Sequence, residues 1–179
     1  MNIFVLDEDP TLAAIYQCDK HISKMIVETA QMLSTNIRLT NGNTSISKEF
    51  ERHLKDPNRK EIYKVSYQNH PCTIWARKTK GNFLWLKKHG LALCDEYNYR
   101  YEKIHGSYPI IASCRSDTIP VGELTKFELC MPDIYKQENA VEAYRNLYAF
   151  DKSRFAKWNK VRPPPEWYSD KIKSILLKS

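Results

Sequence analysis

The chain has 179 residues, of which 42% are hydrophobic, so one domain can bury a core of its own without disulfides or metal. Lysine and arginine number 28 against 21 aspartate and glutamate, and the net charge of +7 favours a polyanionic partner such as nucleic acid. No stretch approaches the roughly 20 apolar residues of a membrane span, and the acidic Asp7 comes too early for a signal peptide. We therefore expect a cytoplasmic protein that does not contact the membrane.

The five cysteines are spread along the chain. No two of them are closer than 16 residues, which fits neither the CxxC spacing of a zinc knuckle nor a dense disulfide framework. Unpaired cysteine is among the most frequently buried residue types, so we interpret the set as buried free thiols. Its members are Cys18, Cys72, Cys94, Cys114 and Cys130.

The first third of the chain predicts two helices after a short apolar segment. Residues 2–6 are too few to assign by periodicity, so we expect either a strand or an N-terminal segment laid in the core. Asp9 followed by Pro10 is a typical helix start and predicts a short helix over residues 10–18. Apolar residues three and four apart then predict a long core-facing helix from 19 to about 39.

The middle of the chain predicts a surface insertion followed by a central helix. Residues 41–68 are polar and charged, and we expect a surface excursion with one helical turn near 49–54. After a turn at 69–71, apolar residues at helical spacing predict a central helix from about 74 to 105, in one piece or broken near Lys80-Gly81.

The last third predicts irregular structure, then helix, then a basic tail. Prolines predict an irregular stretch over residues 106–135, and a helix is expected from 138 to about 158. Three prolines at 163–165 stop it, and a short helix follows over 169–177. Basic and aromatic residues alternate across the C-terminal segment 152–179, a composition that suits either a phosphate backbone with unstacked bases or a solvated face with aromatics turned inward. Together these patterns predict a mainly α, compact, single-domain fold over residues 1–179.

A row of polar side chains marks the helix predicted for residues 19–39. His21, Lys24, Glu28 and Gln31 lie three or four residues apart and would share one face beside the apolar stripe. One interpretation is a solvated stripe, since an i,i+4 pair such as Lys24–Glu28 contributes only about 0.2–0.5 kcal/mol. The other interpretation is an active site.

A carboxylate beside an amine is the pair of groups that base excision requires. The amine attacks the sugar C1′ or forms its Schiff base, while the carboxylate stabilises charge and moves protons. Glu28 is the candidate carboxylate, and the candidate amines are Lys20, Lys24 and the α-amino group of Met1. As a class, α-amines titrate roughly two to three units below lysine, which makes them better nucleophiles near neutral pH.

Three islands of sequence, in the same order, resemble the pyrimidine-dimer DNA glycosylases of the phage endonuclease V family. Asp19-Lys20-His21 with Glu28 nine residues after Asp19 resembles the family's Asp-Gln-His and later Glu. Asn69-His70, followed by a Lys- and Phe-Leu-bearing stretch, resembles the Gly-His that leads into the family's central helix. Arg162-Pro163 with Trp167-Tyr168 resembles its C-terminal element that contacts DNA at the lesion.

The resemblance implies a compact helical domain, a nucleophilic N-terminal α-amine, Glu28 as the catalytic carboxylate and His21 in the substrate pocket. It implies no metal or other cofactor, and it implies DNA bending and a flipped base. The chain departs from the family at Val27 and Gln31, where the family has arginines, so phosphate contacts at the site come from elsewhere or are absent. The family's nucleophile is a Thr exposed by loss of the initiator Met, whereas here Met1 precedes Asn2.

We therefore predict a DNA glycosylase, with or without an AP-lyase step, that acts as a monomer on pyrimidine dimers or modified pyrimidines, in the host-cell cytoplasm if the chain is phage-encoded. The alternatives are a non-catalytic nucleic-acid-binding protein and an enzyme of free nucleotides. The candidate catalytic residues are Glu28, His21, Met1 and Lys24. The candidate nucleic-acid contacts are Asn2, Lys20, Gln31, His70, Arg77, Arg162, Trp167 and Tyr168.

Overall fold

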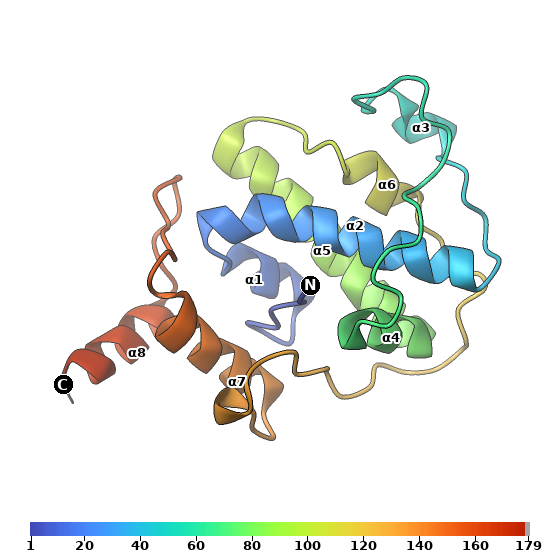
Figure 1. The fold of residues 1–179 in the computed structure, drawn as a ribbon. Coiled ribbons are helices and arrows are strands. Elements are labelled where there is room, and N and C mark those ends of the chain that lie inside the picture. The colour runs from blue at the N-terminus through green and yellow to red at the C-terminus, as the bar shows by residue number, and fades with distance from the viewer. Residues whose placement is uncertain (178–179) are drawn as a thin grey trace.

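The computed structural model describes residues 1–177, whose regular structure is helical (Figure 1). This part contains no strand beyond an isolated bridge between Ser45 and Glu61, so the mainly α fold predicted from the sequence is confirmed. In chain order the elements are α1 (Pro10–Ile15), α2 (Asp19–Leu39), α3 (Lys48–Glu51), α4 (Pro71–Lys78), α5 (Lys80–Tyr101), α6 (Tyr108–Ser113), the 3-10 turn η1 (Asp133–Tyr135), α7 (Ala140–Leu147), the π-helical turn η2 (Tyr148–Lys152) and α8 (Glu166–Leu176).

The centre of the fold is the packing of α2 against α5. Helices α1 and α4 pack on α5, and α6 contacts both long helices, as Figure 1 shows. Gly90 of α5 lies where α2 passes closest, because a Cβ added there would come within 2.5 Å of the Thr29 methyl group. Within the described residues, no helix combines the length and apolarity needed to cross a membrane.

The N-terminal segment lies in the core as irregular chain. Of the two alternatives for residues 2–6, the structure therefore shows the segment laid in the core, since Ile3, Phe4, Val5 and Leu6 are all buried. This placement carries the start of the chain across to the middle of α2. The segment is positioned by burial of its apolar side chains, because it forms no sheet hydrogen bonds.

Local capping explains where several helices begin. The Asp9 carboxylate accepts the N–H groups of Thr11 and Leu12, and α1 starts there as predicted, although it ends at Ile15 instead of residue 18. The predicted central helix is in two pieces. The break falls at Thr79, one residue before the expected position at Lys80-Gly81. Thr79 is extended, and its hydroxyl accepts the N–H of Asn82.

Two predictions for the last third were wrong in detail. The helix expected to reach residue 158 ends as α7 at Leu147 and continues only through η2. Tertiary contacts explain the early end: the Lys157 carbonyl accepts the N–H of Asp19, and the Asp19 carboxylate accepts the N–H of Asn159 at 2.7 Å. This stretch of backbone therefore forms hydrogen bonds with Asp19 at the start of α2 instead of continuing the helix. The irregular stretch expected over 106–135 also contains the short helix α6.

Candidate active site

Glu28 lies on α2 at the point where the start of the chain reaches the helix. Its Oε2 accepts the N–H of Asn2 at 3.0 Å, and the N-terminal ammonium of Met1 lies 3.9 Å from the same oxygen. Lys24, one turn earlier, places its Nζ 3.5 Å from Oε1. The Glu28 side chain is 13% exposed and that of Lys24 is 62% exposed. A carboxylate thus meets two amines at the edge of the solvent, and we call this group, with Asn2, the amine site.

A tight turn at Asn2 fixes the direction of the N-terminus. The Asn2 side-chain oxygen accepts the N–H groups of Ile3 and Phe4, and its amide nitrogen donates to the Cys130 carbonyl at 2.8 Å. Phe4 adopts a φ of 40°, a left-handed conformation that is uncommon for an aromatic residue and is held here by burial. Chain ends are usually loose unless tied down, and this one is tied down beside Glu28.

His70 reaches the amine site from the start of α4. Its Nδ1 accepts the N–H of Cys72 at 3.2 Å and so caps the helix, which has Pro71 in its first turn. Burial lowers the pKa of His70, and the positive N-terminus lowers it further, while the carboxylates of Glu28 and Glu128 act in the opposite direction. The imidazole is therefore close enough to interact with the charges of the N-terminus and of Glu28.

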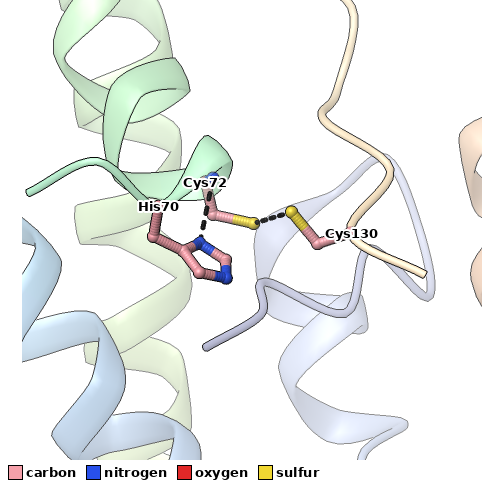
Figure 2. A group of neighbouring side chains, drawn as sticks. All are labelled: His70, Cys72 and Cys130. Atoms are coloured by element: carbon pink, nitrogen blue, oxygen red, sulfur yellow. Dashed lines mark hydrogen bonds between the residues drawn. The ribbon is translucent and has the colours of Figure 1, made fainter. Parts of the chain in front are cut away.

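Two cysteines meet beside His70. Cys72 comes from the first turn of α4, and Cys130 comes from the irregular chain before η1, as Figure 2 shows. The Cys72 thiol donates to the Cys130 sulfur, with the two Sγ atoms 3.2 Å apart. This contact raises the pKa of Cys72, as does its burial, and it lowers the pKa of Cys130.

His21 occupies a different environment from Glu28. It is 4% exposed, its ring stacks on Phe4 with centroids 4.4 Å apart, and its Nδ1 lies 2.5 Å from the Tyr148 hydroxyl. The ring of Phe155 packs edge-on against it. Burial, followed by the positive charges of Lys24, Lys152 and Lys20, lowers the pKa of His21 to about 3. We call Phe4, His21, Tyr148 and Phe155 the aromatic cluster; it holds His21 neutral and away from solvent.

A basic groove lies beside Val27 and Gln31 of α2. A hollow of about 390 Å³ is lined by Val27 and Gln31 of α2 and by Arg59, Tyr63 and Lys64 of the predicted insertion. Arg59 lies over the Tyr63 ring, 5.2 Å from its centroid. Sequence analysis did not single out Arg59 or Lys64, because only the folded chain brings them beside α2.

The remaining basic candidates differ in how far other groups of the protein already pair with them. Lys20 is exposed, with its Nζ 4.6 Å from the centroid of the Phe155 ring. Arg77 donates to the Gln68 carbonyl at 2.7 Å. Arg162 donates to both oxygens of Glu96, at 2.9 and 3.0 Å, and lies over the Tyr99 ring. Much of the charge of Arg162 is thus matched within the protein.

The two C-terminal aromatic candidates pack against the rest of the chain. Trp167 is half-buried and contacts the rings of Tyr16 and Tyr148, and Arg145 lies 5.1 Å from its centroid. Tyr168 is 9% exposed and packs on Trp158. For these two rings the structure shows the second alternative given for the C-terminal segment, in which the aromatic side chains turn inward.

Asp19, the first residue of the Asp19-Lys20-His21 motif, supports the start of α2. Its carboxylate accepts from Arg100 at 2.9 Å, and Arg100 also donates to Glu96 and to the carbonyls of Ile15 and Gln17. This buried charge network was not foreseen, since Arg100 carries no distinguishing local signal. The motif therefore combines one residue of the framework, Asp19, with one exposed cation, Lys20.

A helical domain that brings its own amino terminus to a carboxylate has the groups needed for chemistry at a sugar carbon. A family model described as pyrimidine dimer DNA glycosylase matches residues 1–107. That range is more than half of the chain, and the chain belongs to this family, as the resemblance predicted. Membership supports a repair function of the DNA glycosylase type and implies DNA as the substrate. No curated protein and no solved structure matches the chain.

Proposed function

We propose that this protein cleaves the bond between the sugar C1′ and the base at pyrimidine dimers or modified pyrimidines in DNA, with an N-terminal amine as nucleophile and Glu28 as the catalytic carboxylate. The observation that carries the proposal is the convergence of the Met1 and Asn2 nitrogens on one oxygen of Glu28, at 3.9 and 3.0 Å. A surface ion pair would not require the first residue of the chain to be buried to 2% exposure at its side chain.

The chemistry follows from these two groups. The unprotonated amine donates its lone pair to C1′ of the damaged nucleotide, the bond from C1′ to the base breaks, and the base leaves with the electron pair and takes up a proton. Loss of a proton from the attached nitrogen and opening of the sugar ring then produce a Schiff base. Glu28 stabilises the positive charge that develops at the sugar and carries protons between nitrogen and ring oxygen. Water releases the enzyme, or removal of a C2′ proton cleaves the strand as an AP lyase.

The structure offers three nitrogens for this role. The Met1 amine is one, and Lys24 is a second because its Nζ is 3.5 Å from Glu28. The Asn2 nitrogen is the third: it already hydrogen-bonds Glu28, and removal of Met1 would turn it into the α-amine. We favour an α-amine over Lys24, because α-amines as a class titrate roughly two to three units below lysine side chains and are better nucleophiles near neutral pH.

Phosphate contacts, in this proposal, come from the insertion. Arg59 and Lys64 line the hollow beside Val27 and Gln31, where they substitute for the two arginines that the family carries on the helix. Gln31 lines the same hollow, His70 lies near the N-terminus and Glu28, and in this proposal both contact the nucleotides around the flipped base. In this proposal Lys20 and Arg77 add further positive charge for DNA. Arg162 and Trp167 hold the C-terminal segment against the rest of the chain through Glu96 and Tyr16, and Tyr168 packs on Trp158 within that segment. The His21 ring stacks on Phe4 and so supports the turn of the N-terminal segment.

Borohydride trapping on duplex DNA bearing a pyrimidine dimer or a modified pyrimidine tests the proposal. We expect a covalent adduct with the wild-type protein and none with Glu28→Gln. Digestion of the adduct should place the DNA on the N-terminal peptide, and the intact mass of the free protein decides whether that peptide begins at Met1 or Asn2. No adduct and no abasic product on any of these substrates would refute it, and an adduct at Lys24 would move the nucleophile.

The two alternative functions predict other outcomes. A non-catalytic nucleic-acid-binding protein would bind duplex DNA with strong salt dependence that is unchanged by Glu28→Gln. An enzyme of free nucleotides would release the base from a mononucleotide as fast as from duplex. The basic groove favours duplex DNA over a free nucleotide as the substrate, because its cations border the same stretch of α2 as Glu28.

A further inference from the structure

His70, Cys72 and Cys130 form a cluster that the proposed excision chemistry does not use. One ligand atom from each, an imidazole nitrogen and two sulfurs, lies within 4.8 Å of the other two. Figure 2 shows the side chains converging from the start of α4 and from the chain before η1. Cys72 and Cys130 are 58 residues apart in the sequence, which is why no cysteine spacing predicted the cluster.

The backbone around the cluster is held in place on both sides. Cys72 is fully buried in the first turn of α4, and the hydroxyl of the next residue, Thr73, donates to the Met1 sulfur at 3.8 Å. The Cys130 carbonyl accepts from the Asn2 side chain. The hydroxyl of buried Tyr144 donates to the Glu128 carbonyl at 2.6 Å and anchors the same stretch of chain. The three donor atoms are therefore brought together by the fold before any ligand binds.

The chemistry of the donors selects the ligand. Two sulfurs and one imidazole nitrogen suit soft and borderline ions, whereas Mg²⁺ and Ca²⁺ require oxygen ligands, which the cluster lacks. Zinc binds Cys sulfur at about 2.3 Å and His nitrogen at about 2.0–2.1 Å in a tetrahedron, and sites with three protein ligands take a solvent molecule as the fourth. We propose that His70, Cys72 and Cys130 bind a zinc ion, with solvent in the fourth position.

Binding requires only small adjustments. Sulfurs on a tetrahedral zinc are roughly 3.8 Å apart, so the pair, now at 3.2 Å, must open slightly. Cys130 can supply this movement because it is half-exposed and lies outside any helix. Each thiol loses its proton to solvent as the metal binds. His70 gives up its cap on Cys72, and loss of one capping hydrogen bond is small beside the gain from two thiolate ligands.

The ion would lie beside the amine site. It would join the start of α4 to the segment that accepts from Asn2, and Asn2 in turn donates to Glu28. Zinc therefore stabilises the turn that places the N-terminal amine, in addition to the hydrogen bonds described above. The inference does not depend on the proposed excision reaction, because the same three ligands would bind metal in a protein without that activity.

The rival explanation is a disulfide between the same two sulfurs. Its formation removes two electrons and two protons, and therefore requires an oxidant such as a small-molecule disulfide. A disulfide would not involve the His70 imidazole, and the described residues show no second cysteine pair of the kind that small disulfide-rich domains use. A metal site gives all three side chains a role, so zinc is favoured over the disulfide.

Cobalt binding to the full-length protein, purified reduced and metal-free, is the direct experiment. Tetrahedral thiolate coordination predicts a near-ultraviolet sulfur-to-cobalt band together with intense visible bands, and Zn²⁺ should displace both at one ion per chain. Cys130→Ser, at a half-exposed position, should weaken binding by more than the roughly 10–100-fold that loss of an outer-shell partner costs. His70→Asn keeps a residue suited to capping α4 and should weaken binding to a similar extent.

Cys94→Ser is the matched control, because this buried thiol lies on α5 and belongs to no donor cluster among the described residues. Its cobalt spectrum and zinc affinity should equal those of the wild type. The proposal is overturned if the reduced wild-type protein gives no sulfur-to-cobalt band, or if Cys130→Ser binds cobalt as tightly as the control. It is also overturned if the native protein, kept under reducing conditions, is found by mass to be two hydrogens lighter than the free-thiol chain.

Discussion

Glu28 and His21 lie seven residues apart on one helix, yet the regions around them differ in every property that matters for catalysis. The amine site holds a partly exposed carboxylate among cations, whereas the aromatic cluster holds a neutral imidazole 4% exposed. The difference arises because the N-terminal segment crosses α2 between them: Phe4 stacks on His21 and buries it, while the Met1 amine lies beside Glu28. Equal spacing on a helix therefore does not produce equal access to substrate.

Glu28→Gln is expected to have the largest effect on this comparison. Loss of a positioned acid–base group typically costs about 10²–10⁴-fold in rate, and the amide cannot carry the negative charge that stabilises the developing cation. Single-turnover base release should fall by that factor while the thermal midpoint changes little. Glu142→Gln, on α7 and paired with Lys171, is the control and should keep full activity. Equal activity of the two variants would show that Glu28 is only a surface ion-pair partner.

His21→Ala is expected to affect stability more than chemistry. Removing a buried ring that stacks on Phe4 leaves a cavity, for which we expect a loss of about 2–4 kcal/mol in the free energy of unfolding. Tyr148→Phe removes only the hydroxyl partner and should cost about 1–2 kcal/mol. Urea unfolding measures both, and base release per folded molecule should stay within severalfold of wild type. A rate loss as large as that of Glu28→Gln, with stability unchanged, would mean that His21 contacts substrate.

Acid should unfold the protein through its buried histidines. Burial lowers the pKa of His21 and of His89 to about 3, against an ordinary value of 6.5. The unfolded chain therefore binds more protons below pH 6.5, and stability falls as the pH drops from 6.5 toward 3. At pH 5 the loss is about 2 kcal/mol for each histidine. Urea unfolding at pH 7 and 5 measures it, and His89→Gln should flatten the profile; a slope equal to that of wild type would contradict this cause.

Substitutions in the basic groove should produce the smallest change. Replacing Arg59 and Lys64 with Ala should reduce the salt dependence of duplex binding by about one unit in slope for each phosphate that the protein no longer neutralises. Binding at a fixed moderate salt concentration should weaken only severalfold. Arg115→Ala is the control, because this side chain pairs with Asp117 and lies outside the groove. If all three variants show the wild-type slope, the DNA backbone does not follow the groove beside Gln31.

Local patterns were enough to predict the helical framework and part of the site. The Asp9-Pro10 start, the apolar stripe of α2 and the Lys24–Glu28 pairing depend on residues within one or two turns of each other, so they can be derived from spacing. The helix predicted from 138 to about 158 ends at Leu147 instead, because its end depends on contacts between distant residues. Residues 157–159 satisfy the start of α2 instead, a contact that no local pattern contains.

By itself, the sequence determined the fold class, the family and the choice of Glu28 as the candidate carboxylate, since periodicity and the ordered motifs are properties of neighbouring residues. Only the tertiary structure decided that His21 is buried, that Arg162 is matched by Glu96, and that Cys72 meets Cys130. Each of these depends on segments distant in the sequence packing against one another. These contacts form because the whole core packs together, and the spacing of residues within one segment does not predict them.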